Sequence, residues 1–134
     1  MDSLIEKTVA EMREALILGC VAALLSSCGT EPSCQNEILG TSPNPKGTLV
    51  AVAFSRNCGA TVGNNLQISI VRQGDLPEGK GNALILDNAP PYSEMAKPVW
   101  TNNDHLTLSK PKNARIFLNE ESVLGVDITF LELR

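Results

Sequence analysis

The residues that could carry out acid–base or nucleophilic chemistry are few and widely spaced. His105 is the single histidine of the chain, and Asp104 stands directly before it. A histidine oriented by a carboxylate could activate a serine or cysteine nucleophile. Adjacent residues of a strand point to opposite faces, however, so Asp104 is badly placed to orient His105. Glu120 and Glu121 could form a carboxylate pair, but their polar surroundings favour a solvated loop.

Three other side chains are candidates for binding a partner rather than for catalysis. Arg56 precedes the glycine-rich stretch 59–63, which lacks the lysine and the following helix of a phosphate loop. The Arg56 side chain could bind an anion or flank the edge of a sheet. Tyr92 and Trp100 belong to the one aromatic and proline-rich region, and aromatic side chains are common at binding hot spots, although Trp100 could equally be a core residue. The stretch 87–98 is therefore the expected recognition loop.

Length and composition exclude several classes of protein. The chain has 134 residues, which is enough for one domain and too few for a two-domain enzyme. A hydrophobic content of 43% excludes global disorder. The net charge is −4, aromatic residues make up 4%, and no basic cluster occurs, so nucleic-acid binding is not expected. Without a nucleophile–base pair or a metal-ligand set, we predict no enzymatic activity, no cofactor and no metal site.

The amino-terminal segment has the pattern of a secretory signal. Residues 15–25 form an uncharged apolar run of eleven residues. Spanning a bilayer takes about 20 residues, whereas the apolar core of a secretory signal needs 7–15. The run ends in Leu25-Ser26-Ser27-Cys28, which resembles the lipobox of bacterial lipoproteins. This resemblance implies cleavage before Cys28 and acylation of that cysteine, and more than one acyl chain gives stable attachment to a membrane.

One feature of the leader departs from the usual pattern of a signal. Residues 1–14 have a net negative charge, where the leading region of a signal is normally positive. A start at Met12 in place of Met1 would give a signal of ordinary proportions. We therefore interpret residues 1–27 as a signal peptide with an upstream extension, in preference to one helix packed on the domain. Residues 28–33 then form a tether, and residues 34–134 form a β domain.

The predicted location is the bacterial cell envelope. Gly29 follows Cys28, and in enterobacterial-type lipoproteins this resembles the signal for the outer membrane, on its periplasmic side. In such an exported chain Cys20 is removed with the signal and Cys28 is acylated. Cys34 and Cys58 remain, and an oxidising compartment favours a disulfide between them, worth about 3–4 kcal/mol. These two cysteines match neither a zinc site nor a Cys-x-x-Cys redox pair.

The rest of the chain shows the pattern of short strands separated by turns. Seven strands are expected, at 48–54, 66–70, 83–86, 99–100, 105–108, 116–118 and 126–130. Residues 48–54 are apolar on both faces, which is typical of a central strand. No helix is expected after Cys28. The predicted fold is all-β, a small antiparallel sandwich or barrel of about seven strands.

Several motifs together resemble a family of small bacterial proteins, many of which have lipoprotein signals and no assigned activity. The motifs are Cys34 ahead of Ser42-Pro43, the strand end Phe54-Ser55-Arg56, the string Asn57-Cys58-Gly59-Ala60-Thr61, and the late Trp100 followed by a polar turn and Leu-x-Leu. The resemblance covers most of residues 34–130. It implies the β fold, export and the disulfide, and it implies no reaction.

These observations lead to two functional hypotheses. The first is a non-enzymatic envelope lipoprotein, held at the membrane through its acyl chains, whose β domain binds an envelope protein. A specific form of it is an inhibitor or immunity factor against a hydrolase such as lysozyme, because a rigid scaffold lowers the ordering cost of binding. The alternative is a structural accessory lipoprotein of an envelope assembly.

Overall fold

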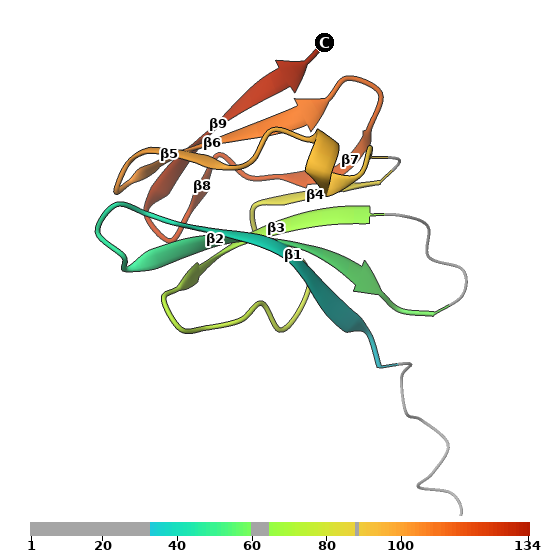
Figure 1. Ribbon diagram of the computed structural model, residues 1–134, viewed down its shortest axis with the longest axis horizontal. Helices are drawn as coiled ribbons and strands as arrows, with labels where there is room; N and C mark the ends of the chain where they lie inside the picture. The colour runs from blue at the N-terminus through green and yellow to red at the C-terminus, as the bar shows by residue number, and fades with distance from the viewer. Residues whose placement is uncertain (1–32, 60–64, 88) are drawn as a thin grey trace, which may run out of the picture. The chain divides into compact units, whose positions relative to one another are not determined.

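Two β-sheets packed face to face make up the part of the chain that the structure, a computed structural model, describes (Figure 1). This part comprises residues 33–59, 65–87 and 89–134. The predicted all-β sandwich is confirmed, and Cys34–Arg134 form one compact unit. The predicted signal peptide, Cys28 and most of the predicted tether lie outside the described residues. Within the described ranges no helix has the length and apolar character needed to cross a membrane.

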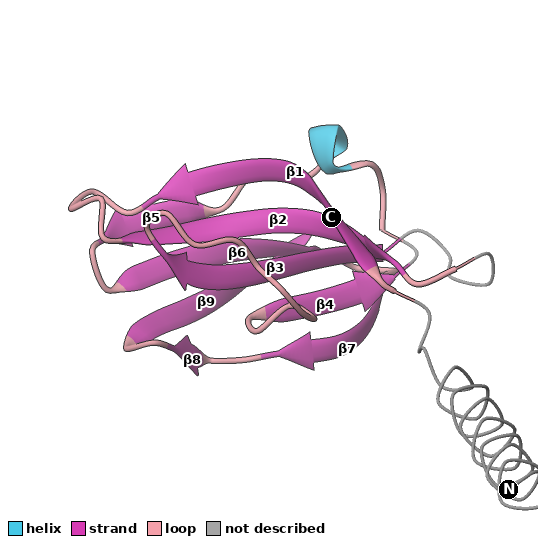
Figure 2. Ribbon diagram, turned by 90° about the horizontal axis from the view of Figure 1, so that it is seen from below, coloured by secondary structure: helices cyan, strands magenta, loops and turns pink. Residues whose placement is uncertain are grey.

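The larger sheet, sheet A, is antiparallel throughout. Its strands, in spatial order, are β1 (Gln35–Pro43), β2 (Leu49–Asn57), β3 (Asn65–Arg72), β4 (Leu84–Asp87) and β7 (Arg115–Asn119). The smaller sheet, sheet B, has the order β5 (Val99–Asn102), β6 (His105–Pro111), β9 (Val126–Leu133) and β8 (Ser122–Val123). Figure 2 shows β7 and β8 together along one side of the sandwich, with β1 on the other.

One pairing differs from the antiparallel arrangement that the sequence predicts. In sheet B, β6 and β9 run parallel, from His105 opposite Asp127 to Pro111 opposite Leu133. Parallel neighbours need a long crossover connection. Here the chain leaves β6, adds β7 to the edge of sheet A, and returns through β8 to enter β9 in the same direction as β6. A strand order of this kind is invisible to alternation patterns within single strands.

A strand lies at each of the seven stretches expected from the sequence, although β2 begins at Leu49 and β4 at Leu84, and the described residues add two further strands and a short helix. The first added strand is β1, an edge strand with mostly exposed residues and a register shift between Ile38 and Gly40, so its sequence lacks clean alternation. The second is β8, which has only two residues. The helix is a single 3-10 turn, η1 (Tyr92–Glu94), drawn in cyan beside β1 in Figure 2.

The main core fills the space between the two sheets. Its buried apolar residues are Ala51, Ala53, Leu66, Ile68, Ile70, Ala83, Leu84, Leu86, Met95, Leu106, Leu108, Val126 and Ile128. The alternating residues of β3, β6 and β9 supply one face each, which is why their period of two is clear in the sequence. Ala51 and Ala53 of β2 share this cluster with Met95, which follows the 3-10 turn, and with residues of sheet B.

Strand β2 is buried on its other face as well, as its apolar sequence predicts. The second buried cluster consists of Val50, Val52, Phe54 and, partly buried, Val71. It lies on the side of sheet A that faces away from sheet B, where the chain between β3 and β4 folds back beneath the sheet (Figure 1). Such small clusters under long loops are a common complement to a main core.

Side-chain amides fasten this returning loop, residues 73–83, to β3. The Asn82 amide accepts a hydrogen bond from the Ile70 N–H (2.8 Å) and donates one to the Ile70 carbonyl (2.9 Å). The buried Gln67 side chain accepts a bond from the Gly81 N–H at 2.7 Å. These bonds replace the strand partner that β3 lacks there, so the loop can cover the second cluster without leaving buried backbone groups unsatisfied.

Candidate binding cleft

A cleft opens at the end of the sandwich where β1, β2 and β3 meet the segment 89–92. Its volume is about 310 Å³. The lining consists of Glu37 and Leu39 of β1, Ser55 of β2, Asn65 and Leu66 of β3, and residues 89–92. Glu37 is the one charged residue of this lining, and leucine, alanine, proline and tyrosine side chains supply most of the remainder. The cleft therefore suits a neutral or basic group with an apolar surface.

Tyr92 forms one wall of this cleft and is held in place by its short helix. The 3-10 turn is closed by bonds from the Glu94 N–H to the Pro91 carbonyl (2.9 Å) and from the Met95 N–H to the Tyr92 carbonyl (3.1 Å). Met95 is 5% exposed and anchors the turn in the main core. Partial burial raises the pKa of the Tyr92 hydroxyl, so this group remains a hydrogen-bond donor at neutral pH.

Gly40 of β1 permits the Tyr92 ring to occupy its position. A Cβ atom at residue 40 would lie 2.7 Å from Cε1 and 2.8 Å from the hydroxyl oxygen of Tyr92. Both distances are shorter than van der Waals contact, so any side chain there must displace the ring. Gly40 also follows the bulged Leu39, which is 39% exposed and lines the cleft. The β1 bulge thus shapes the cleft wall.

Trp100 lies against the same strand but belongs to the fold rather than to the cleft lining. Its indole Nε1–H donates to the Ser42 carbonyl of β1 at 2.8 Å, and its ring packs against the main core. Because Trp100 is in β5, this contact fastens sheet B to the edge of sheet A. The core interpretation of Trp100 that the sequence left open fits this placement.

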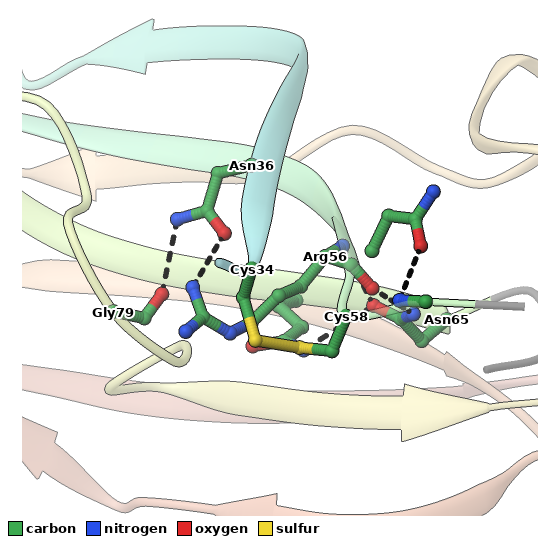
Figure 3. Close-up of a disulfide and its surroundings, with 9 residues drawn as sticks. Cys34, Asn36, Arg56, Cys58, Asn65 and Gly79 are labelled. Carbon is green, nitrogen blue, oxygen red and sulfur yellow. Dashed lines mark hydrogen bonds between the residues drawn. A yellow bond between two sulfur atoms is a disulfide. The ribbon is translucent and has the colours of Figure 1, made fainter. Parts of the chain in front are cut away.

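Arg56 lies on the opposite face of sheet A, beside the disulfide, as Figure 3 shows. Its Nη1 donates to the Asn36 Oδ1 at 2.8 Å, and the Asn36 Nδ2 donates to the carbonyls of Pro77 (2.8 Å) and Gly79 (3.0 Å). Arg56 Nε is buried and has no hydrogen-bond partner among the described residues. The guanidinium therefore supports the returning loop through Asn36, and it contributes nothing to the cleft.

The Cys34–Cys58 disulfide closes the open end of the β1–β2 hairpin, as expected (Figure 3). It follows directly on the last pair of the ladder, Gln35 opposite Asn57. The Asn65 amide adds a rung beyond the β2–β3 ladder, since it accepts from the Arg56 N–H (2.9 Å) and donates to the Arg56 carbonyl (2.8 Å). Ser55 and Asn65 of the cleft lining thus lie next to backbone that the disulfide and the Asn65 hydrogen bonds hold in place.

The residues with potential for acid–base chemistry are scattered. His105 Nε2 is 2.8 Å from the Thr129 hydroxyl, on β6 and β9, whereas the Asp104 N–H is bonded to Asn102. Glu120 and Glu121 are exposed in the connection before β8. The described ranges contain no group of three His, Cys, Asp or Glu residues that could hold a metal ion. The glycine-rich stretch 60–63 lies outside the described residues.

Of the three predicted binding residues, only Tyr92 lines the cleft. The predicted recognition loop, apart from residue 88, which lies outside the described residues, contributes Ala89, Pro90 and Pro91 as well. Sequence reasoning missed Glu37, Leu39 and Gly40, which come from the one long strand it did not find. The bulge that makes Leu39 a lining residue leaves no periodic signal.

No protein-family model, curated protein or solved structure matches this chain.

Proposed function

We propose that this protein is a non-enzymatic lipoprotein of the bacterial cell envelope whose β domain binds an envelope protein in the cleft between β1 and residues 89–92. The cleft itself is the observation that carries the proposal. It combines an exposed apolar residue, Leu39, with the Pro90–Pro91 pair and Tyr92, beside strands that the Cys34–Cys58 disulfide holds together. Such preordered surfaces lower the entropic cost of association.

The size and charge of the cleft define the group that it would accept. A volume of about 310 Å³ is at the lower end of small-molecule sites and suits one large side chain of a protein partner. Glu37 at the rim favours a basic or neutral side chain over an acidic one. An aromatic or arginine anchor would stack on Tyr92 and Pro91, and these are the residue types that dominate binding hot spots.

The anchor part of the proposal rests on the sequence around Cys28 and on the disulfide. A cysteine after a short apolar run, with the Leu25-Ser26-Ser27 string before it, supports acylation. The Cys34–Cys58 disulfide supports an oxidising location, because cytosolic thiols are kept reduced. The short stretch 28–33 would then hold the sandwich close to the membrane surface.

Site-specific photocrosslinking in cells tests the proposed site. A photoreactive amino acid replaces Leu39 in one variant and Leu76, which is 68% exposed and not part of the cleft lining, in the other. We expect a discrete envelope partner to crosslink to position 39 and not to position 76. Equal capture at both positions, or none at position 39, contradicts the proposed site.

Two glycine variants provide the matched control. Gly40→Ala forces the Tyr92 ring out of the cleft wall, whereas Gly79→Ala adds a methyl group with nothing within 4 Å and no conformational penalty of positive φ. The crosslink at position 39 should be lost in the first variant and kept in the second. A soluble hydrolase as partner would specify an inhibitor, and a component of a membrane assembly would specify an accessory role.

A further inference from the structure

Three of the four outer edges of the two sheets carry a bulge. Strands β1, β5 and β7 each contain one residue more than their partner, and these extra residues are Leu39, Thr101 and Phe117. A bulge twists an edge away from an additional strand and so protects it from pairing with another chain. In β7 the charged Arg115, which is ion-paired with Asp87 of the neighbouring strand β4, adds a charge to this edge.

The edge of β9 differs from the other three. Strand β8 pairs only with Val126 and Asp127, and the Ile128 N–H donates to the Glu121 carbonyl at 2.9 Å. Beyond that point, residues 129–133 have no strand partner on the β8 side within the described chain. On their other side they pair with β6 without any register shift. This five-residue edge is regular and unprotected by a bulge.

The alternation of the backbone shows which groups this edge presents. The Asp127 N–H points toward β6, where it donates to Asp104, and the Ile128 N–H points to the open side. Alternation then places the N–H and C=O groups of Phe130 and Glu132 on the open side as well. Leu131, between them, is 54% exposed. Unpaired backbone groups beside an exposed leucine are the features that favour strand addition.

We propose that residues 129–133 of β9 pair antiparallel with the same residues of a second copy of this chain. The two-fold axis passes between the two Leu131 residues, which face each other as a non-hydrogen-bonded pair. Phe130 of each copy then exchanges both of its backbone bonds with Glu132 of the other copy. The two copies of sheet B become one continuous sheet. The pairing ends at Ile128, whose N–H is already bonded to Glu121.

Charge complementarity favours a second copy as the occupant. Lys110 of β6 is in register with Glu132, and its Nζ lies 5.0 Å from the centroid of the Phe130 ring. In the proposed pairing Glu132 of one copy lies opposite Phe130 of the other, and therefore beside the Lys110 ammonium of that copy. The two-fold axis creates this carboxylate–ammonium pair twice. This inference is independent of the proposed function, because the cleft and the β9 edge share no residues.

Cysteine crosslinking tests the register directly. Leu131→Cys and Thr129→Cys are compared in the full chain, purified in mild detergent, with Cys20 and Cys28 replaced by serine. Directly opposite residues have Cβ atoms about 4.5–5.5 Å apart, so Leu131→Cys should form a disulfide-linked dimer. Thr129→Cys, which faces Leu133 of the other copy, should crosslink at least about tenfold more slowly. Equal rates, or no dimer in either variant, overturn the proposal.

A charge exchange tests the partner assignment. Lys110→Glu and Glu132→Lys should each raise the dissociation constant of the dimer by at least about tenfold, because each places like charges together. The double variant restores opposite charges and should recover the affinity of the parent chain. Sedimentation measures the association, and thermal unfolding checks that each variant is folded. A monomer at all concentrations, or a dimer insensitive to both exchanges, contradicts the assignment.

Discussion

The disulfide end of sheet A and the open edge of β9 handle exposed backbone in opposite ways. At the disulfide end, the side chains of Asn36 and Asn65 bond to backbone groups of other segments. A covalent bond between Cys34 and Cys58 closes the same region. At the open edge, residues 129–133 leave their outward backbone groups to water or to another chain.

This difference shows which parts of the molecule are constrained by stability and which are free for interaction. The fastened region buries Phe54 completely under a loop that has little apolar content of its own, so polar contacts must hold that loop. At the open edge Leu131 is exposed, while the half-buried Phe130 packs against the main core. Substitutions at the two regions should therefore differ strongly in their effect on the free energy of unfolding.

The largest expected effect is that of Phe54→Ala. Phe54 is 0% exposed in the cluster under the loop, and removing a buried aromatic side chain costs about 3–5 kcal/mol of unfolding free energy. Leu131→Ala, at the open edge, should change it by less than about 0.5 kcal/mol in the monomer. Urea unfolding of both variants measures the contrast. A similar loss at the two positions would remove the distinction between the regions.

Loss of the disulfide should have the second-largest effect on the free energy of unfolding. Replacing both Cys34 and Cys58 by serine should lower the free energy of unfolding by about 3–4 kcal/mol, because the unfolded chain regains the freedom of the closed loop. The fluorescence of Trp100, the single tryptophan, reports the transition. Parent protein unfolded in the presence of reductant should match the variant. An unchanged midpoint would show that the hairpin end is fixed without the covalent bond.

The bonds from Asn36 to the loop 73–83 should contribute less to the free energy of unfolding. Asn36→Ala removes two bonds to the loop and the partner of the Arg56 guanidinium, which should cost about 1–3 kcal/mol. Asn113→Ala, in an exposed turn, serves as the matched control and should stay within about 0.5 kcal/mol of the parent. Denaturant titration distinguishes them. If the two variants are equally stable, the returning loop does not depend on Asn36.

The smallest effect concerns pH. Partial burial raises the pKa of Tyr92 above its ordinary value of 10.0, so the unfolded chain releases this proton first as the pH rises. The contribution is fully present below pH 10 and is lost as the pH passes through the raised pKa of the folded state. Because Tyr92 is the single tyrosine, ultraviolet titration of the folded protein reads it directly. Ionisation at the ordinary value, or a Tyr92→Phe variant with unchanged alkaline destabilisation, would contradict this burial.

Local patterns predicted the elements of the main core well. Leu66, Ile68 and Ile70 alternate because one face of β3 is buried, and the apolar residues of β2 reveal a strand covered on both sides. Strand β1 was not predicted, because its edge position and its bulge at Leu39 remove the alternation of apolar and polar residues. The parallel pairing of β6 and β9 arises because the chain between them adds β7 to sheet A before it returns to sheet B. The residue pattern within a single strand does not indicate this path.

The candidate site was only partly accessible from the sequence. The proline pair and Tyr92 stood out as an aromatic stretch, and they line the cleft. Glu37 and Gly40 carry no local signature, since their role depends on the register of β1 against β2. Arg56 was conspicuous as a cation near a turn, but its guanidinium bonds to Asn36, a residue that only strand pairing brings near.

We propose that this β sandwich acts as a lipid-anchored envelope module, and the mass of the mature chain tests this proposal most directly. Mass spectrometry of protein isolated from membranes, without reduction, should find an amino terminus at Cys28 carrying acyl chains. The same spectrum should show Cys34 and Cys58 joined. A chain that still begins at Met1 or Met12, with an unmodified Cys28, would contradict the account.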